Sequence, residues 1–562
     1  MRFFSVFAMV VMFAGFVRSE EFEISQVIHP IVEKMAEPKL TEGFAQVPMA
    51  ITTSSEYAAK HFALGLAKFN TSWDFEAYRH FCHVVKLDPE CLMGYWGISL
   101  SLARGNHEFF SQRKAAIDRM LDLLEKIKEG DGGGWNPLEK GFAQATGLLL
   151  TDGQRVAGKT FQGLAKKYPA NIQAHLLSLS LQRDGFDRFG RPQLGQRRAV
   201  DGIRKLLEQH PDDPSVMVFW INTMCQDPGG VKALREEVLP VARSLASKNP
   251  DYAPYLLLLA QVESRCGNAK EGLKAATKAL ELYRIYQKSE GVSIYDCDGV
   301  IRAQLFQADL LFLLGKQKEA FVITKELAGL KVEAERVYSK GAVMLMWEGR
   351  TLGARLLAAK ETPKDFLVAQ EMLGLLKEEE WFKEKSYALR YRNCLGYYFI
   401  VRGAVADGKE EVAKNLYTQF LERVRLFEET RPLASKTSSF TNWLRAMKTT
   451  GMMVFELRGL VAELGKGATK ETAGTWYRSA LDRQDTPVNL LPPVFPYPVQ
   501  LRLASHYAGL EKYTESASWY LKGLERRPNH PVLLNGLSKI ADKLGKTQKA
   551  ASLQKQIEGL IK

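Results

Sequence analysis

Apolar and small residues along this chain follow a helical spacing that repeats about every 34 residues. In the clearest unit, 253–286, Leu259 and Ala260 put a large and then a small side chain on a first helix, and Gly267 permits a turn. Three small residues then let a second helix lie close against the first: Gly272, Ala276 and Ala279. The unit therefore predicts a helix hairpin.

The same frame recurs in register at three other places, 58–91, 138–171 and 497–530. A proline, which cannot continue a helix, stands near the end of each of these units: Pro89, Pro169 and Pro528. Looser copies fill the rest of the chain: 92–128, 172–213, 214–252, 301–334, 335–380, 394–427, 454–485 and 531–562. We therefore predict an all-α, right-handed superhelical solenoid of about twelve helix-turn-helix repeats, with a groove on its concave side.

The repeat residues resemble the tetratricopeptide-repeat (TPR) family. The stretch from Asp88 to Gly97 reads DP-x-C-x-M-x-YWG, which is similar to the first repeat of a bacterial exported branch of that family, and Pro492–Pro498 matches its proline-rich lead-in. Where that branch has Phe-Asn-His, this chain has Asn70 to Phe75 without a histidine. The resemblance implies a helical solenoid that acts as an interaction scaffold, with no particular ligand.

The N-terminus reads as a secretory signal peptide. Met1 and Arg2 give a positive start, Phe3–Val17 is apolar, and Ser19 suits the position before a cut that leaves Glu20 first. The alternative is a retained anchor, but the apolar run is shorter than the ~20 residues that a spanning helix needs. We expect a periplasmic or extracellular protein without a transmembrane segment after cleavage.

The chain then divides into four further parts. Residues 20–54 carry no repeat and are expected to cap the first hairpin, and 55–485 form the TPR-like solenoid. Five prolines among apolar residues predict an extended spacer on the solenoid surface at 486–498, followed by a C-terminal TPR pair at 499–562. An insertion at 184–194 is expected to project as a loop that provides a second contact for a ligand.

The composition indicates which classes of partner the protein could bind. The 562 residues are 46% hydrophobic with a net charge of +13, so long-range attraction favours acidic proteins, anionic polymers or lipid headgroups. Export and the even spread of Lys and Arg argue against nucleic acid. The six cysteines are too few for a disulfide-stapled fold.

Soft ligands gather in the first two repeats, within 47 residues: His61, His80, Cys82, His83, Cys91 and His107. His80 and His83 share a helix face, from which Cys82 points away, so these three cannot all bind one ion. The weak metal candidates are His61, His80, His83 and Cys91. A Cys82–Cys91 disulfide and ordinary packing are the alternatives.

Signatures of catalysis are missing: Gly-x-Ser-x-Gly, His-Glu-x-x-His and a phosphate loop. We therefore expect a protein that is not an enzyme and needs no cofactor. Its candidate site is the groove, whose expected lining mixes aromatic, amide and charged residues: Trp96, Phe142, Asn222, Gln261, Arg265, Arg302 and Asp309. Amides would bond a peptide backbone, and Arg265 and Arg302 would pair with carboxylates.

Three functions remain open from the sequence. The first is an exported scaffold that binds a protein or peptide in the groove. The second is a metal-binding or redox protein that uses the His and Cys cluster. The third is an envelope structural protein that holds anionic polymers. The groove residues have a simpler alternative, which is packing between repeats. The oligomeric state is not predicted.

Overall fold

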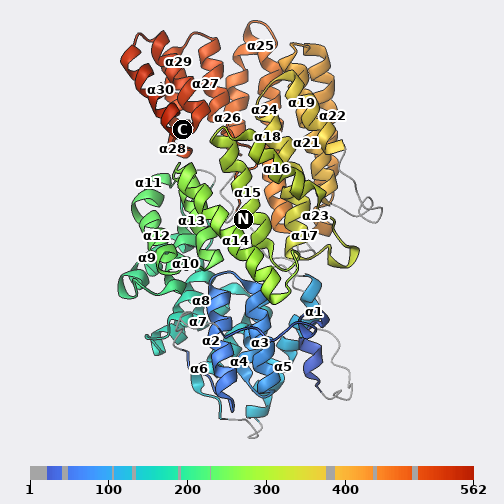
Figure 1. Ribbon diagram of the computed structural model, residues 1–562, viewed down its shortest axis with the longest axis vertical. Coiled ribbons are helices and arrows are strands. Elements are labelled where there is room, and N and C mark those ends of the chain that lie inside the picture. The colour runs from blue at the N-terminus through green and yellow to red at the C-terminus, as the bar shows by residue number, and fades with distance from the viewer. Residues whose placement is uncertain are drawn as a thin grey trace.

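The computed structural model describes residues 22–40, 49–103, 107–128, 134–187, 191–227, 230–374, 387–434, 440–483 and 491–561. Within these ranges the chain consists of helix hairpins, with no strand beyond an isolated bridge between Phe186 and Pro192. Figure 1 shows the hairpins stacked side by side in an elongated, wound array. The predicted all-α, TPR-like solenoid is confirmed.

The N-terminal part carries the unrepeated segment and the first hairpins. Its elements are η1 (Ile24–Val27), α1 (Pro30–Glu33), α2 (Glu56–Asn70), α3 (Asp74–Leu87), α4 (Leu92–Ser101), η2 (His107–Phe109), α5 (Phe110–Lys128), α6 (Pro137–Thr151) and α7 (Gln154–Lys167). The middle part follows with α8 (Ile172–Gln182), α9 (Leu194–Gln209), α10 (Pro214–Met224), α11 (Val231–Ala233), η3 (Leu234–Val238), α12 (Leu239–Lys248), α13 (Ala253–Arg265), α14 (Ala269–Glu290), α15 (Asp298–Leu313) and α16 (Gln317–Gly329).

The C-terminal part completes the array. Its elements are η4 (Ala334–Arg336), α17 (Lys340–Met344), η5 (Leu345–Gly349), α18 (Arg350–Ala358), α19 (Pro363–Gly374), α21 (Tyr387–Ala406), α22 (Glu410–Glu428), α23 (Arg431–Ala434), α24 (Phe440–Glu463), α25 (Ala468–Glu471), α26 (Ala473–Leu481), α27 (Gln500–Gly509), α28 (Tyr513–Arg526), α29 (Pro531–Lys543) and α30 (Thr547–Ile561).

The four units in register each form a hairpin, namely α2 with α3, α6 with α7, α13 with α14, and α27 with α28. The small residues act as expected. Ala260, Ala276 and Ala279 are fully buried between helices of the middle part. Gly65 and Gly97 lie against the ring of Phe81, where an added Cβ would come within 2.8 and 2.4 Å of ring carbons. Close helix approach therefore depends on these small side chains.

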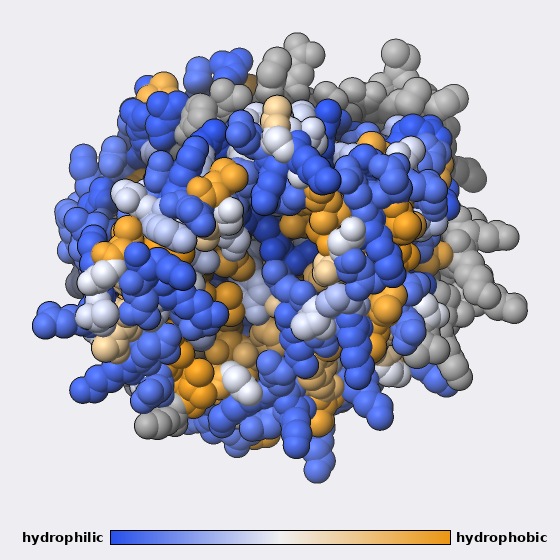
Figure 2. Space-filling view, turned by 90° about the horizontal axis from the view of Figure 1, so that it is seen from above, coloured by the Kyte–Doolittle hydropathy of each residue, from blue (hydrophilic) through white to orange (hydrophobic). Residues whose placement is uncertain are grey.

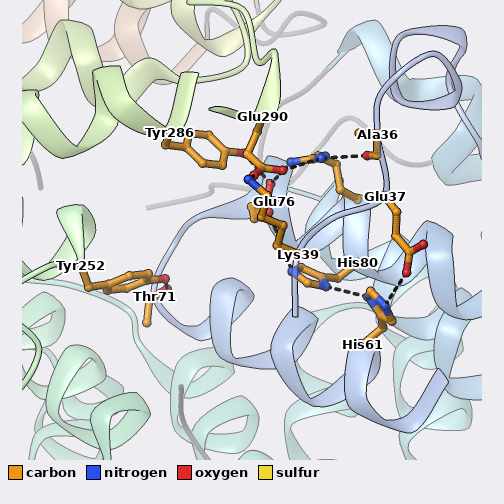
Figure 3. A network of polar contacts seen from close by, with 11 residues as sticks. Ala36, Glu37, Lys39, His61, Thr71, Glu76, His80, Tyr252, Tyr286 and Glu290 are labelled. Atoms are coloured by element: carbon orange, nitrogen blue, oxygen red, sulfur yellow. Dashed lines mark hydrogen bonds and ion pairs between the residues drawn. The ribbon is translucent and has the colours of Figure 1, made fainter. Parts of the chain in front are cut away.

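Polar contacts join the first hairpin to helices far along the chain. The Thr71 and Tyr252 hydroxyls lie 2.7 Å apart, and Arg79 on α3 donates to Glu290 at 3.2 Å (Figure 3). Lys340 also pairs with Asp74. The solenoid is wound so tightly that its first hairpin touches its middle.

The C-terminal hairpins touch the middle part as well. The Asn529 side chain donates to the carbonyl of Gly267 at 3.1 Å, and Lys270 donates to the carbonyl of Gly559 at 3.1 Å. Figure 1 shows α28 lying just above α13. Contacts of this kind partly close the interior, where the repeat pattern alone predicts an open groove.

Gly267→Ala is expected to weaken this contact. Gly267 has φ +80°, and an added Cβ would lie 2.3 Å from the Pro528 carbonyl oxygen. The left-handed conformation costs about 1–2 kcal/mol for a residue with a Cβ, and overpacking adds about 1–3 kcal/mol. Chemical denaturation of both proteins would measure the sum.

Gly545→Ala is the matched control for that experiment. Gly545 occupies the equivalent turn between α29 and α30 with φ +72°, but an added Cβ meets nothing within 4 Å. Gly545→Ala should lower the free energy of unfolding only by the cost of the left-handed conformation, about 1–2 kcal/mol. Equal losses in the two variants would show that the Gly267 contact does not stabilise the protein.

Several expectations concern residues outside the described ranges. These are the leader at 1–19, residues 41–48 of the predicted cap, residues 188–190 of the inserted loop, and residues 486–490 of the spacer. No helix within the described ranges combines the length and apolar character that crossing a membrane requires.

Candidate functional site

A cavity of about 130 Å³ lies inside the solenoid, between the middle helices and the C-terminal hairpins. This is roughly ten times the space that one water molecule needs. We call it the interior pocket, and the residues that line it include Gln261, Arg265, Phe306, Asp309, Leu313, Arg445, Leu491, Pro492, Pro493, Pro496, Arg526, Arg527, Pro528, His530 and Leu560. Figure 2 looks onto the C-terminal end and shows a hollow with hydrophobic side chains on its walls.

One wall of the pocket is residues 491–499, which we call the proline passage. The sequence places this segment on the solenoid surface, but the described part is largely buried, with Val494 only 3% exposed. The prolines have no N–H to satisfy, whereas the carbonyl groups still need donors when they are buried. The passage can therefore lie inside wherever helices supply those donors.

Arginine and histidine side chains supply the donors. Arg355 donates to the Val494 carbonyl at 2.9 Å, and Arg445 donates to the Pro492 carbonyl at 2.8 Å. Arg527 donates to the Phe495 carbonyl at 2.8 Å and also bonds that of Pro496. His530 Nε2 lies 3.0 Å from the Pro496 oxygen, so it carries the proton of the neutral ring. These side chains fix the passage against α18, α24 and the α28–α29 junction.

Two buried polar side chains face the pocket. Gln261 on α13 is 1% exposed, and neither its amide oxygen nor its amide nitrogen has a partner. Asp309 on α15 is 3% exposed. Burial raises the pKa of its carboxyl to about 6, against the opposing effect of the Arg527 and Arg355 charges. An unpaired buried polar group costs roughly 1–3 kcal/mol, so a ligand that pairs with the Gln261 amide would recover that cost.

The remaining charged candidates are paired within the protein. Arg265 lines the pocket but donates to the carbonyls of Cys225 and Asp227 at 2.6 and 2.8 Å. Arg302 forms an ion pair with Asp298 at 2.6 Å. Arg302 and Asn222 line a smaller cavity of about 30 Å³ beside Trp73. Gln261, Arg265 and Asp309 therefore line the interior pocket, whereas Asn222 and Arg302 line the smaller cavity.

The assignment of Trp96 and Phe142 to a groove is wrong. Both are fully buried, their rings pack edge to face at 5.3 Å, and Trp96 Nε1 donates to Thr146 at 3.0 Å. They pack between repeats, which was the simpler alternative. The mapping fails because α4 and α6 are covered on both sides by neighbouring helices.

The histidine candidates come together at the first hairpin. His61 on α2 lies beside His80 and His83 on α3, with its Nδ1 3.0 Å from that of His80. Glu37, in the segment after α1, places Oε1 at 3.3 Å from His61 Nε2 and 2.9 Å from His83 Nε2. Burial lowers the pKa of all three histidines, that of His61 to about 4, so the rings are neutral at neutral pH. Figure 3 shows His80, His61 and Glu37 in one connected chain.

Neither cysteine candidate joins this cluster. Cys82 and Cys91 are both free thiols in the structure, so the Cys82–Cys91 disulfide is not formed, and Cys91 lies outside the group of possible ligands. Cys82 points instead towards the Val27 carbonyl, 4.0 Å away, because it lies on the face of α3 opposite the histidines. Burial raises the pKa of both thiols to about 12, which makes them unreactive at neutral pH.

Five residues of these two sites are not predicted by the repeat pattern: Glu37, Arg355, Arg445, Arg527 and His530. Glu37 lies in a segment without repeats, so nothing in the pattern brings it to α2 and α3. The arginines and His530 lie outside the slots that a TPR frame assigns to the groove. The one available signal was the proline passage itself, because a buried segment with so many prolines requires side-chain donors.

No family model matches this chain, and no curated protein matches it. Among solved structures it is similar to a human IFIT1 dimer with m7Gppp-AAAA, at 14% identity and a TM-score of 0.34, covering 90% of this chain and 91% of that chain. A human IFIT1 dimer with PPP-AAAA is 13% identical with a TM-score of 0.34, and the match covers 90% of this chain and 91% of that chain. Yeast Tom70 is 13% identical with a TM-score of 0.28, and the match covers 90% of this chain and 92% of that chain. At this level of likeness no ligand, partner or compartment carries over to this chain.

Proposed function

We propose that this protein is a non-catalytic scaffold that binds a peptide, or a segment of another protein, in the interior pocket. The observation that carries the proposal is the buried amide of Gln261, which faces the cavity beside Asp309 and has no hydrogen-bond partner among the described residues. A primary amide offers both a donor and an acceptor, which is the pairing that a peptide unit needs. The carboxyl of Asp309 accepts a further N–H.

The walls of the pocket fit the same ligand. Pro492, Pro493 and Pro496 give a rigid apolar surface that needs no ordering when a ligand binds. Four arginines line the pocket against the one aspartate, and the whole chain carries +13. Long-range attraction therefore favours a partner with acidic residues around the segment that enters.

Two observations argue for binding over catalysis at this place. Burial lowers the pKa of His530 to about 3, and its Nε2–H is held by Pro496, so this histidine is a poor general base. Cys225 and Cys266, beside Arg265, are buried thiols with raised pKa values. Neither supplies an activated nucleophile.

The proposal includes export, as in the bacterial branch that the first repeat resembles. It rests on the apolar run at 3–17 and the small residue at Ser19. Mass spectrometry of the protein recovered from its source should give Glu20 as the first residue. A chain that keeps residues 1–19 and stays in the cytoplasm would contradict this part of the proposal.

Gln261→Met tests the binding site. The substitution keeps the volume and removes both unpaired polar atoms, so the protein should fold with equal or greater stability. The loss of two hydrogen bonds should lower the affinity for the captured partner about tenfold. The measurement is affinity capture from extracts of the source, followed by titration of the captured partner with both proteins.

Gln196→Met is the matched control. Gln196 on α9 is also fully buried with both amide atoms unpaired, but it lies outside the interior pocket. It should match Gln261→Met in stability and match the unmodified protein in capture. Equal capture by all three proteins, or capture of RNA in place of a protein, would rule out the proposed peptide site.

A further inference from the structure

Three possible metal ligands from three separate segments converge beside the first hairpin. Glu37 follows α1, His61 lies on α2 and His83 lies on α3, and their ligand atoms all fall within 4.8 Å of one another. This site is separate from the interior pocket and does not depend on the proposed peptide binding.

The nitrogen of His61 that faces the cluster contacts Glu37 without the geometry of a hydrogen bond. Its Nε2 is fully buried and lacks a hydrogen-bond partner among the described residues, although Glu37 Oε1 lies 3.3 Å away. A buried ring nitrogen is normally paired. An ion at this point would pair with it, together with the Nε2 of His83 and the carboxylate.

The spacing is close to what zinc requires. With zinc–nitrogen and zinc–oxygen bonds of about 2.0–2.2 Å, neighbouring ligand atoms of a tetrahedral site lie about 3.3–3.5 Å apart. Glu37 Oε1 lies 3.3 Å from one histidine nitrogen and 2.9 Å from the other. All three ligand atoms lie within 4.8 Å of one another, so small shifts of the three side chains would bring them around one ion.

His80 orients His61 for such a role. When His61 Nε2 binds a metal, Nδ1 carries the proton and donates to His80 Nδ1, 3.0 Å away. His80 then carries its own proton on Nε2, which faces Glu76 Oε1 at 3.8 Å. A hydrogen bond to the second ring nitrogen fixes the tautomer and orientation of a metal-bound histidine.

We propose that Glu37, His61 and His83 bind one zinc-class divalent transition-metal ion, with His80 as the positioning residue for His61. Two imidazoles and one carboxylate favour such ions over Mg²⁺ and Ca²⁺, which prefer oxygen ligands. Three protein ligands leave one position for water, and His83 and Glu37 are 17% and 57% exposed, so the ion is reachable from solvent.

The ion would fasten the N-terminal segment to the first hairpin. That segment is already held on both sides of Glu37, because Arg79 donates to the Ala36 carbonyl at 3.0 Å and Lys39 pairs with Glu290 at 2.8 Å (Figure 3). Metal binding adds a link that the unfolded chain cannot make, so it stabilises the fold in proportion to its affinity.

The test is a calorimetric titration of the full mature chain with Zn²⁺, after treatment with and removal of a chelator. We expect one ion per chain, no comparable binding of Mg²⁺, and slower proteolysis between Lys34 and Lys39 when Zn²⁺ is bound. Glu37→Gln and His83→Ala should each weaken binding by at least ~10-fold. Both residues are partly exposed, so neither change should prevent folding.

Glu33→Gln is the control for Glu37→Gln, because it removes an exposed carboxylate from the same segment outside the cluster. It should bind Zn²⁺ as the unmodified chain does. Binding below one ion per chain, or binding that survives both Glu37→Gln and His83→Ala, overturns the proposed site. A change in peptide capture is not expected, so failure here leaves the interior pocket untouched.

Discussion

Replacing Arg355 with methionine is expected to lower the free energy of unfolding by about 3–5 kcal/mol. Arg355 on α18 is 1% exposed, and it joins the Val494 carbonyl to the Glu348 carboxylate, which lies 3.0 Å away. Glu348 is itself buried, so the change leaves a carboxylate with Arg445 as its remaining ion-pair partner and a carbonyl of the proline passage unpaired. Urea denaturation should show a lower midpoint.

Arg284→Met is the control for that prediction. Arg284 on α14 pairs with Glu326 at 2.8 Å, but both side chains are about half exposed. Exposed pairs contribute about 0–1 kcal/mol because water screens them. A loss of similar size in both variants would mean that the Arg355 contact is no stronger than a surface ion pair, and that something else holds the proline passage inside.

The hairpins of this fold could be predicted from sequence because their cause is local. Small residues at 260, 276 and 279 decide how closely α13 and α14 approach, and Pro528 ends α28 whatever surrounds it. The winding of the solenoid could not be predicted. It depends on pairs such as Arg79 with Glu290 and Asn529 with Gly267, whose partners are separated by 211 and 262 residues.

The residues of the candidate sites also differ in whether a local sequence pattern could predict them. His61, His80 and His83 could be recognised because they are close in sequence and share helix faces, and Gln261 and Asp309 follow from the repeat frame. Glu37 could not, because a segment without repeats gives no position relative to α2. Trp96 was misplaced because a frame that assumes an open groove cannot show that neighbouring helices cover both sides of a helix.

Asp309→Asn is expected to make the protein more stable at neutral pH and less able to bind its partner. The carboxyl has a pKa of about 6 in the folded protein, raised above the ordinary 3.8 by burial. The folded state therefore keeps its proton up to higher pH than the unfolded state does. This difference destabilises the fold increasingly from about pH 4 to pH 6 and fully above that, by about 3 kcal/mol.

Asparagine removes this titration, so unfolding curves of the two proteins should coincide near pH 4 and separate above pH 6, with the variant more stable. Asp298→Asn on the same helix should behave oppositely, because Asp298 is paired with Arg302 and lies in the first turn of α15. The Asp298→Asn variant should lose a little stability at neutral pH.

If Asp309→Asn gains no stability above pH 6, the carboxyl already has a stabilising partner in the free protein. If the Asp309→Asn variant is more stable but captures less partner, Asp309 belongs to the binding site. Replacing a side chain that only supported the fold would lower stability and would not lower capture by itself.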